Sequence, residues 1–486
     1  MLFLAFVAAA APKSASDTVT EAALMRHIAV LADDALQGRR PGTAGGKKAV
    51  RYIAAQMRAA GLSPGAMDGG WYQPVDLVER RPLGAAMRWR ARGAAVPVAD
   101  DELALLGRDP VMKLASAPII FGGYGLKSDL EDADVAGAIV LLLSGNPGHV
   151  SNPPPIEARR SALAKAGAAA VVMLMPSDAR WENIRGQFRN GRTTLARDDA
   201  PALSGAMAYP AWTRLLAAAA GRDPRQLERA AGERGFRAIR LPAEAELRVR
   251  TAVRRYRSVN VIGRIDGTGK SGEAVLFTAH WDHLGICRPR GVKDRICNGA
   301  VDNASGIAVM LEAARGIAAG PRPVRDILFV ATTAEELGLL GARAFVRDPP
   351  MPLGAIMANL NLDTMAVAPR GAPVGIVGRG MTPLDPLIEA TARALGRKVD
   401  TDSEANAYVT RQDGWVLLSA GVPAVMVGGA FSEPGPMGRY FATRYHGPGD
   451  DVSSGLELGG AAEDAELHIG LGRALADPTR FPRPAR

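Results

Sequence analysis

The stretch that decides the fold spans residues 279–306. It reads Ala-His-Trp-Asp-His-Leu-Gly at 279–285 and, after a short basic loop, Asn-Gly-Ala-Val-Asp-Asn-Ala-Ser-Gly at 298–306. The apolar run 275–279 has the length of a buried strand, and apolar residues recur at helical spacing from Ile307 to Ala314. The polar residues therefore stand where a strand ends and where a helix begins, the side of an α/β sheet on which ligands bind.

Imidazole and carboxylate side chains gather in this stretch, at His280, Asp282, His283 and Asp302. This mixture of donors is the chemistry of a divalent metal site. Taken alone, His280-x-Asp282 fits equally well a loop in which the two side chains satisfy hydrogen bonds, so the rest of the chain has to decide.

The sequence around this stretch predicts an α/β fold. From about residue 254 onward, strand patterns at 258–265, 275–279, 327–331, 356–362 and 424–427 alternate with helix patterns at 307–318, 337–346 and 384–395. Such alternation predicts a mixed, mostly parallel sheet flanked by helices on both faces.

Four further polar elements adjoin predicted strands, three of them after a strand and the segment 411–414 just before one. They are 331–338 with Glu335 and Glu336, 359–363 ending in Asp363, 411–414 with Asp413, and the loop 445–451 with His446. Adjacent carboxylates repel each other. Glu335 and Glu336 make sense if a cation neutralises one while the other moves a proton.

The donors match the needs of two metal ions. Two imidazoles and three carboxylates supply two private ligands for each ion and one shared carboxylate, with one acid left uncoordinated. Nitrogen and oxygen ligands in this mixture suit zinc, with cobalt or manganese as alternatives.

The order of these motifs resembles the dizinc aminopeptidase family. His-x-Asp, Gly-Ala-x-Asp-Asn-Ala-Ser-Gly, Glu-Glu-x-Gly-Leu-x-Gly-Ala, Asn-Leu-Asp and Tyr-His-x-x-x-Asp occur in the family's order, and residues 36–43 look like its Gly-Arg-x-x-Gly-Thr segment. The middle of the chain looks like a protease-associated domain. One departure concerns 412–414, where Gln-Asp-Gly stands in place of the family's frequent Ser-Asp-His.

The resemblance implies a role for each site residue. His280 and Asp363 would bind one zinc, Glu336 and His446 the other, and Asp302 would bridge both. Asp282 would hold the free N–H of His280, and Glu335 would be the general base. His283 is not a ligand in the family pattern. The implied activity is a zinc exopeptidase with two zinc ions per chain, most simply an aminopeptidase acting on peptide substrates.

Three other functions use a similar site. A binding protein on an inactive peptidase fold would have lost ligands, and none of the positions above is lost. A glutaminyl cyclase would use one zinc ion, and a carboxypeptidase or dipeptidase would recognise other ends of the substrate.

Length and composition divide the chain. Its 486 residues are more than a single hydrophobic core usually accommodates, so more than one domain is expected. We expect a signal peptide at 1–15 and a peptidase domain made of 16–84 and 249–486. Between these two segments we expect an inserted β-rich domain at 85–248 without its own chemistry. Within that insertion, the Arg-rich segment 178–199 reads as a long loop. Helices are expected at 22–31 and 47–62, before the insertion.

The composition excludes some partners and a membrane span. The formal charge is +9, but no dense basic run with interleaved aromatic residues is present, so nucleic-acid binding is not supported. Residues 2–11 are apolar but too short to cross a bilayer; they resemble the hydrophobic region of a signal peptide and predict export to the periplasm or medium. The oligomeric state stays open.

The chain has two cysteines, Cys287 and Cys297, on either side of a basic loop beside the candidate site. Export makes a disulfide between them plausible, worth about 2–3 kcal/mol through loop entropy. Two free thiols are the alternative, and zinc ligation is disfavoured because no Cys-x-x-Cys spacing is present.

Overall fold

The protein is described here by a computed structural model that covers residues 18–151, 153–199, 201–221, 223–432 and 434–483. The chain divides into two compact units, one made of residues 1–75 and 257–486 and the other of 76–256. The signal peptide expected at 1–15 lies outside the described residues. Within those residues, no helix has the length and apolar character needed to cross a membrane.

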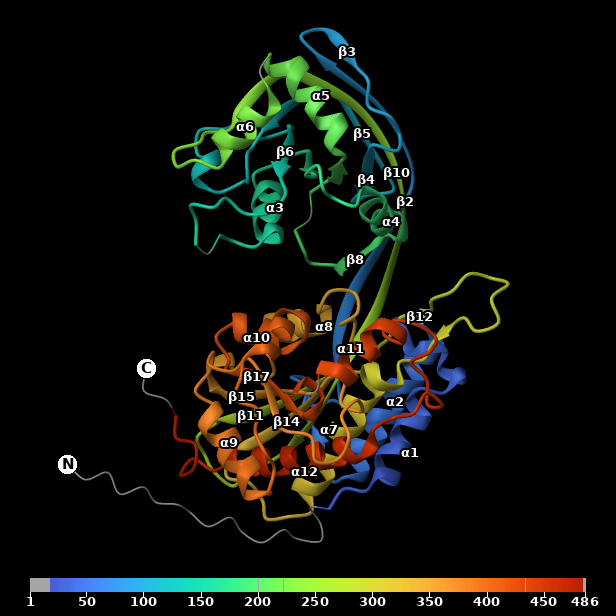
Figure 1. The fold of residues 1–486 in the computed structure, drawn as a ribbon, viewed down its shortest axis with the longest axis vertical. Helices are drawn as coiled ribbons and strands as arrows, with labels where there is room; N and C mark the ends of the chain where they lie inside the picture. The colour runs from blue at the N-terminus through green and yellow to red at the C-terminus, as the bar shows by residue number, and fades with distance from the viewer. Residues whose placement is uncertain (1–17, 152, 200, 222, 433, 484–486) are drawn as a thin grey trace, which may run out of the picture. The chain divides into compact units, whose positions relative to one another are not determined.

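A mixed sheet forms the centre of the larger unit (Figure 1). Its strands lie in the order β16-β17-β15-β11-β14-β10-β1, with β11, β14, β15 and β17 parallel to one another. The bounds are β1 Ser63–Pro64, β10 Ile239–Ile265, β11 Ala274–His280, β14 Asp326–Thr332, β15 Ile356–Asn361, β16 Gly375–Val377 and β17 Ala424–Gly428.

Strand β11 shows why this sheet is covered on both faces. Alternate side chains of a strand point to opposite faces. Val275 and Phe277 join one apolar core, whereas Leu276 joins another that also contains Phe345 and Leu417. A strand buried on both sides reads as the continuous apolar run seen in the sequence.

Helices supply the partners of both cores. Those of the larger unit are α1 Glu21–Leu31, α2 Ala44–Ala59, α7 Gly306–Ala318, α8 Leu340–Arg347, α9 Asp385–Ala394, α10 Gly414–Ser419, α11 Pro434–Thr443 and α12 Leu458–Leu475. The 3₁₀ segments η2 Asp34–Arg39 and η6 Glu404–Arg411 and the irregular π-type turn η4 Ala300–Ser305 add to them. Threonine side chains cap α1 and α2: Thr20 accepts from the Ala23 N–H and Thr43 from the Gly46 N–H.

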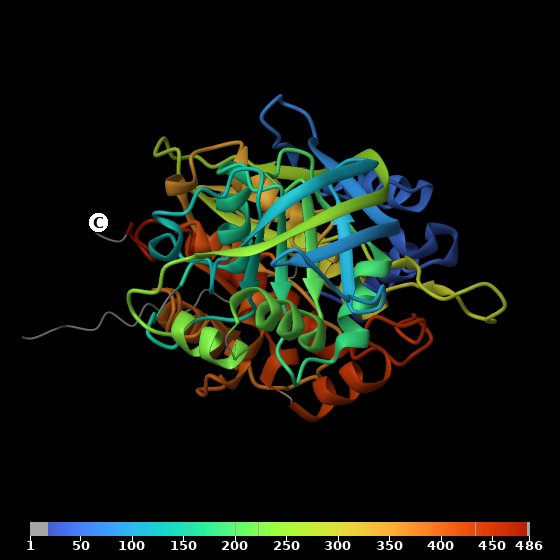
Figure 2. The ribbon, with the colours of Figure 1, turned by 90° about the horizontal axis from the view of Figure 1, so that it is seen from above.

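The unit 76–256 has a core of its own around Trp212 and Phe121. Its strands are β2 Tyr72–Ala91, β3 Ala94–Val96, β4 Leu103–Gly107, β5 Val111–Phe121, β6 Ile139–Leu143, β7 Ala170–Leu174, β8 Arg192–Leu195 and β9 Leu203–Met207, together with the first part of β10. Its helices are α3 Ile156–Lys165, α4 Trp181–Asn190, α5 Tyr209–Ala220 and α6 Pro224–Ala231. The long strands β2 and β10 pair with each other and lie side by side in Figures 1 and 2.

Two details of the predicted elements are wrong. The expected loop 178–199 contains helix α4 and strand β8; the helix places Trp181, Ile184 and Phe188 on one side, a pattern hidden by its polar residues. The helix expected at 337–346 begins only at Leu340, because Glu335 and Glu336 stand in a turn before it.

The limits expected for the insertion, 85 and 248, fall within strands β2 and β10. The boundary of the compact unit instead falls next to Asp76 and Tyr256. Strands that continue across a boundary carry no composition change or turn residue to mark it.

Candidate metal centre

The ends of three neighbouring strands bring the candidate site together. Strand β11 ends at His280 and pairs with β14 on one side and β15 on the other. Glu335 and Glu336 follow β14, and Asp363 follows β15. Because the three strands are parallel, their carboxyl ends meet at one edge, as the sequence predicted.

The first group of donors is His280, Asp302 and Asp363. His280 Nε2 lies 3.1 Å from Asp302 Oδ1 and 3.5 Å from Asp363 Oδ1. The ligand atoms of the three side chains all lie within 4.8 Å of one another. His280 and Asp302 are buried.

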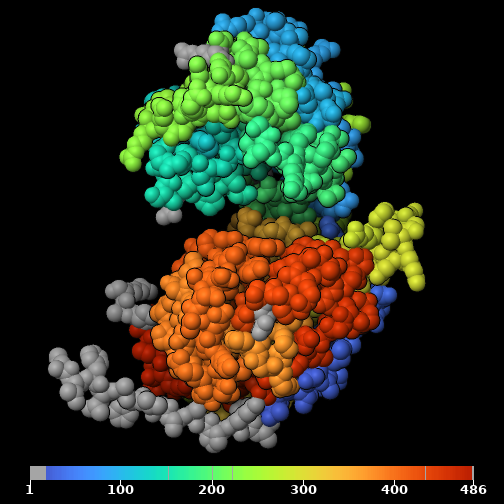
Figure 3. All heavy atoms as spheres, in the orientation of Figure 1, coloured from blue at the N-terminus to red at the C-terminus, as the bar shows by residue number. Residues whose placement is uncertain are grey.

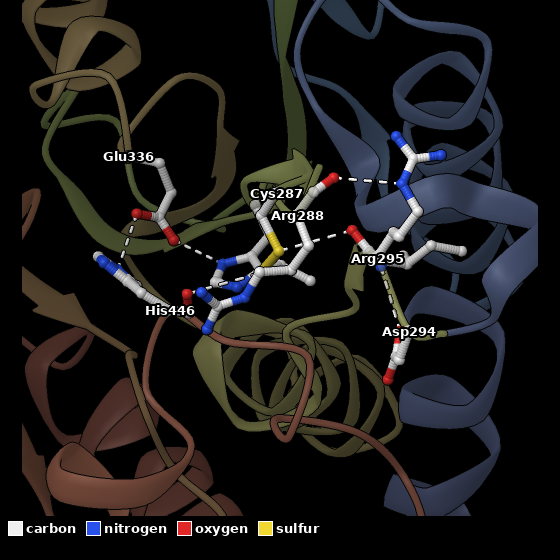
Figure 4. Close-up of a disulfide and its surroundings, with 9 residues drawn as sticks. Cys287, Arg288, Asp294, Arg295, Glu336 and His446 are labelled. Atoms are coloured by element: carbon white, nitrogen blue, oxygen red, sulfur yellow. Dashed lines mark hydrogen bonds and ion pairs between the residues drawn. A yellow bond between two sulfur atoms is a disulfide. The ribbon is translucent and has the colours of Figure 1, made fainter. Parts of the chain in front are cut away.

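The second group of donors is His283, Asp302 and Glu336, and His446 lies next to it. His446 Nε2 lies 3.0 Å from Glu336 Oε2 and 3.4 Å from Asp302 Oδ2. His283, which the family pattern leaves out, lies on the other side: its Nδ1 is 2.5 Å from Glu336 Oε1, and its donor atom also falls within 4.8 Å of Asp302 and Glu336. Figure 4 shows His446 beside Glu336.

Asp302 stands between the two groups. One of its oxygens faces His280 and the other faces His446. This is the arrangement expected of a carboxylate shared by two cations.

The loop that carries Asp302 is tied to its neighbours by side chains. The Asn303 amide donates to the Leu362 carbonyl and accepts from the Gly306 N–H, which fixes the loop against the segment that carries Asp363. At Gly306, a Cβ atom would lie 2.1 Å from Asn303 Oδ1, so only glycine fits this position.

Asp450 holds the same loop from the other side. Its carboxylate accepts from the main-chain N–H of Val301 at 2.8 Å and of Asp302 at 3.0 Å, and the Tyr440 hydroxyl donates to it. The sequence placed Asp450 within a motif but gave it no role. The structure makes it the anchor of the backbone at Asp302.

A buried arginine connects the two halves of the opening stretch. Arg39, from the Gly-Arg-x-x-Gly-Thr segment, is fully buried and donates to the carbonyls of Trp281 at 2.8 Å and Gly299 at 2.9 Å. It also donates to the carbonyls of Leu31 and Asn298. Burial lowers the pKa of Arg39 to about 10, while the carboxylates of the site oppose this shift, so the side chain stays a cation at neutral pH.

The ionisable groups of the centre carry an excess of negative charge. Burial alone would raise the pKa of Asp302, but hydrogen bonds with His280 and His446 hold it well below its ordinary value. Burial would lower the pKa of His446, yet the carboxylates of Asp302 and Glu336 raise it to about 10. Cations are therefore strongly favoured in this place.

Glu335 behaves differently from its neighbour. Burial raises the pKa of Glu335 well above its ordinary value, and the charge of Glu336 adds to the effect. Its Oε2 lies 4.0 Å from His280 Nε2. A carboxylate with raised proton affinity next to a group of ligands suits a general base.

Asp282 differs in one detail from the predicted role. His280 Nδ1 faces the main-chain carbonyl of Asp282 at 3.2 Å and not its carboxylate. The carboxylate Oδ1 instead accepts from the Glu335 N–H at 3.1 Å, and Oδ2 has no hydrogen-bond partner among the described residues. Burial raises the pKa of Asp282 to about 7. Asp282 therefore supports His280 through its backbone and Glu335 through its side chain.

Asp413 is a second buried acid whose role the sequence left open. Its carboxylate accepts from the Thr332 hydroxyl, and burial raises its pKa to about 6. Its other oxygen, Oδ1, has no hydrogen-bond partner among the described residues.

Left-handed backbone marks the site as well. Ala334, Thr364 and His446 have φ values of 55°, 59° and 56°, which residues other than glycine seldom adopt. Each either is a candidate ligand or adjoins Glu335 or Asp363. Such residues cost of order 1–3 kcal/mol each and cluster at functional sites.

The two cysteines form a disulfide, as the sequence suggested. The loop that it closes stands out from the surface of its unit (yellow in Figure 3). Cys297 Sγ lies 3.5 Å from the His446 carbonyl oxygen, so the disulfide borders the centre (Figure 4).

Among the described residues, the two metal-like donor groups both belong to this centre. All five predicted ligands are brought together, along with Glu335 and Asp282. His283 adjoined the motif, but Arg39, Asp413 and Asp450 carried no metal-ligand spacing that would have revealed their roles.

Residues 260–467 match the model of peptidase family M28. A vacuolar membrane protease of Candida dubliniensis is 34% identical over 125 residues, covering 25% of this chain and 12% of that protein. A probable lipoprotein aminopeptidase of Mycobacterium tuberculosis is 26% identical over 255 residues, 50% of this chain and 44% of that protein. The chain thus spans less than half of these relatives.

An aminopeptidase from Aneurinibacillus sp. strain AM-1 has a similar fold, with a TM-score of 0.56, 18% sequence identity and 94% of each chain covered. The predicted fold class, a mixed sheet flanked by helices, is confirmed. The family match also confirms the metallopeptidase resemblance, whereas the individual roles of the site residues stay predictions.

Proposed function

We propose, from the premise that residues 260–467 carry the sequence pattern of peptidase family M28, that this protein is an exported two-zinc aminopeptidase. Asp302 carries the proposal, because each of its two carboxylate oxygens faces a different histidine. A site for a single ion would not need this arrangement, which favours a peptidase over the one-zinc cyclase reaction.

Each residue of the centre has a proposed part. His280 and Asp363 would hold one zinc, Glu336 and His446 the other, and Asp302 both. The donor set fits zinc, since all five ligand atoms are nitrogen or carboxylate oxygen. The zinc pair, when bound, acidifies a water molecule and polarises the scissile carbonyl group.

The chain's own groups would then move the proton. Glu335 accepts it from the attacking water and later delivers it to the leaving amine. The main-chain N–H of Glu335 donates to the Asp282 carboxylate, which keeps the Glu335 backbone in place. The main-chain carbonyl of Asp282 orients the His280 ring.

Two further parts belong to the proposal. Export agrees with the disulfide, because disulfides persist mainly in oxidising compartments. The unit 76–256 would be an inserted accessory domain, related in type to protease-associated domains; it has no metal-like donor group among its described residues.

Metal analysis joined to a substrate panel tests the proposal. The purified chain should hold two zinc ions and hydrolyse aminoacyl-nitroanilides and free peptides, and an N-terminal acetyl group should abolish hydrolysis. One zinc ion with cyclisation of N-terminal glutamine would identify a cyclase instead. Cleavage that ignores the N-terminal block would identify a carboxypeptidase.

A further inference from the structure

Arg411 lies on a platform of aromatic rings. Its guanidinium carbon is 6.0 Å from the ring centre of Tyr408, 5.6 Å from that of Phe441 and 5.9 Å from that of Tyr445. Its Nη2 lies 3.5 Å from the Tyr445 hydroxyl. The rings pack against each other, Phe441 edge-on to Tyr445 with 4.9 Å between centres. A guanidinium held over several rings keeps its charge while part of its hydration is removed.

The platform adjoins the metal centre from two directions. Tyr445 precedes His446, and their rings lie 3.7 Å apart. On the other side, Asp413 follows Arg411 by two residues and reaches Thr332 at the end of β14. Arg411 therefore stands between two segments that both enter the centre.

A second arginine lies on the same rim of the metal centre, next to the segment 445–447. Arg288, next to the disulfide, places Nη2 within 3.9 Å of the position that a Cβ on Gly447 would occupy, and Figure 4 shows it near His446. Arg411 and Arg288 are both exposed. Among the described residues, neither guanidinium has a carboxylate within ion-pair distance.

We propose that Arg411, with Arg288 as a second cation, binds the free C-terminal carboxylate of the substrate, so that the preferred substrates are short peptides. This inference rests on the proposed peptidase function. The interior of the centre is rich in carboxylates that suit a substrate's amine and the metal ions, whereas the rim offers unpaired guanidinium groups. A peptide with a charge at each end matches both.

Chain geometry limits the length of the substrate. Each residue spans at most about 3.3–3.6 Å. Arg411 is separated from the His446 ring by a single aromatic side chain, so a carboxylate one or two residues beyond the scissile bond can reach it. Dipeptides and tripeptides fulfil this condition, and long peptides do not.

Paired substrates test the proposal. We compare leucyl-glycine with leucyl-glycinamide, which differ only at the carboxylate, in the zinc-loaded wild type and in R411M, R288M and R290M. Charge-assisted hydrogen bonds of Arg to carboxylate support about a tenfold to hundredfold preference. We expect the wild type to prefer the free acid in kcat/KM by at least about tenfold, and R411M to remove that preference through KM while the amide changes less than about twofold.

Arg290 serves as the matched control. It lies in the same disulfide-closed loop as Arg288 and is exposed, so R290M removes the same charge without touching the segment 445–447. R288M should show a smaller loss than R411M for the acid alone, and R290M should change neither substrate. Equal losses on acid and amide in R411M, or no acid preference in the wild type, would overturn the proposal.

A binding measurement separates this inference from the proposed activity. The reduced-bond analogues of the two dipeptides cannot be hydrolysed, and calorimetry measures their affinity directly. Tighter binding of the acid analogue to wild type but not to R411M would support the arginine site even in a protein that cleaves no peptide. Equal affinities for acid and amide would reject the arginine site even in an active aminopeptidase.

Discussion

Asp302 concentrates the chemistry of the centre in one side chain. It is buried, donates its backbone N–H to the Asp450 carboxylate, and faces His280 and His446 with different oxygens. A carboxylate placed in this way needs positive charge on both sides. Two cations satisfy it better than the two imidazoles alone.

Glu335 is the first residue whose role can be separated from metal binding. Glu335→Gln keeps the size of the side chain but removes the proton acceptor, so we expect kcat to fall about 10²–10⁴-fold. The zinc content should remain that of the wild type. Steady-state kinetics and metal analysis on the same preparations measure both quantities, and a variant with more than a tenth of wild-type kcat would remove Glu335 from this role.

The two histidines beside Glu336 give a second prediction. His446→Ala should lower the content from two zinc ions to one, because it removes a proposed ligand. His283→Asn should keep both ions, since the amide nitrogen can replace Nδ1 as the donor to Glu336. Metal analysis after dialysis against zinc-free buffer decides between them, and the opposite pattern would make His283 the ligand.

At the scale of elements, apolar runs in the sequence predicted the most deeply buried strands and helices. β11, β14 and β15 were recognised as short continuous apolar runs, because they are buried on both faces, and α7 was recognised by its apolar residues at helical spacing. Helix α4 was missed because its many polar residues hide the spacing of its three apolar side chains, and none of its described residues is buried. The proposed ligands were found through motifs, whereas Arg39 donates to backbone carbonyls, which leave no pattern of residue types.

Helix α12 carries a buried histidine that should make the fold sensitive to acid. The Nδ1–H of His468 donates to the Asp464 carbonyl at 2.7 Å, and burial lowers the pKa of His468 to about 4. The unfolded chain binds the proton near pH 6.5 and the folded chain only near pH 4. The stabilisation is therefore complete above about pH 6.5 and declines as the pH falls towards 4, by about 3 kcal/mol in all.

His468→Gln provides the comparison, because its amide can still donate to the Asp464 carbonyl. The free energy of unfolding from urea titrations, measured at pH 7 and pH 4, should fall by about 3 kcal/mol more in the wild type than in the variant. Burial also raises the pKa of Asp464 to about 6, but this group is present in both proteins. A constant difference between the two proteins would show that His468 stays neutral in both states.

At the scale of the whole molecule, two compact units with separate cores predict two unfolding events. Among the residues that the structure describes, both metal-like donor groups lie in the unit of residues 1–75 and 257–486. Because an ion that binds the folded state stabilises it, chelation should lower one transition temperature and leave the other unchanged. Calorimetry with and without chelator measures this, and adding zinc back should restore the first transition. Equal shifts in both would contradict separate stabilities.

The position of Arg39 sets a limit on how this protein can be cut into parts. The family match covers residues 260–467 only, but the carbonyls of Trp281, Asn298 and Gly299 receive their hydrogen bonds from a residue encoded more than two hundred positions earlier. A gene fragment trimmed to the recognised segment would leave the buried carbonyl oxygens of Trp281 and Asn298 without their Arg39 donor, while the Gly299 oxygen would keep the Ala304 N–H. The smallest fragment that keeps these hydrogen bonds must therefore join the N-terminal helices to the C-terminal sheet, by a linker in place of residues 76–256.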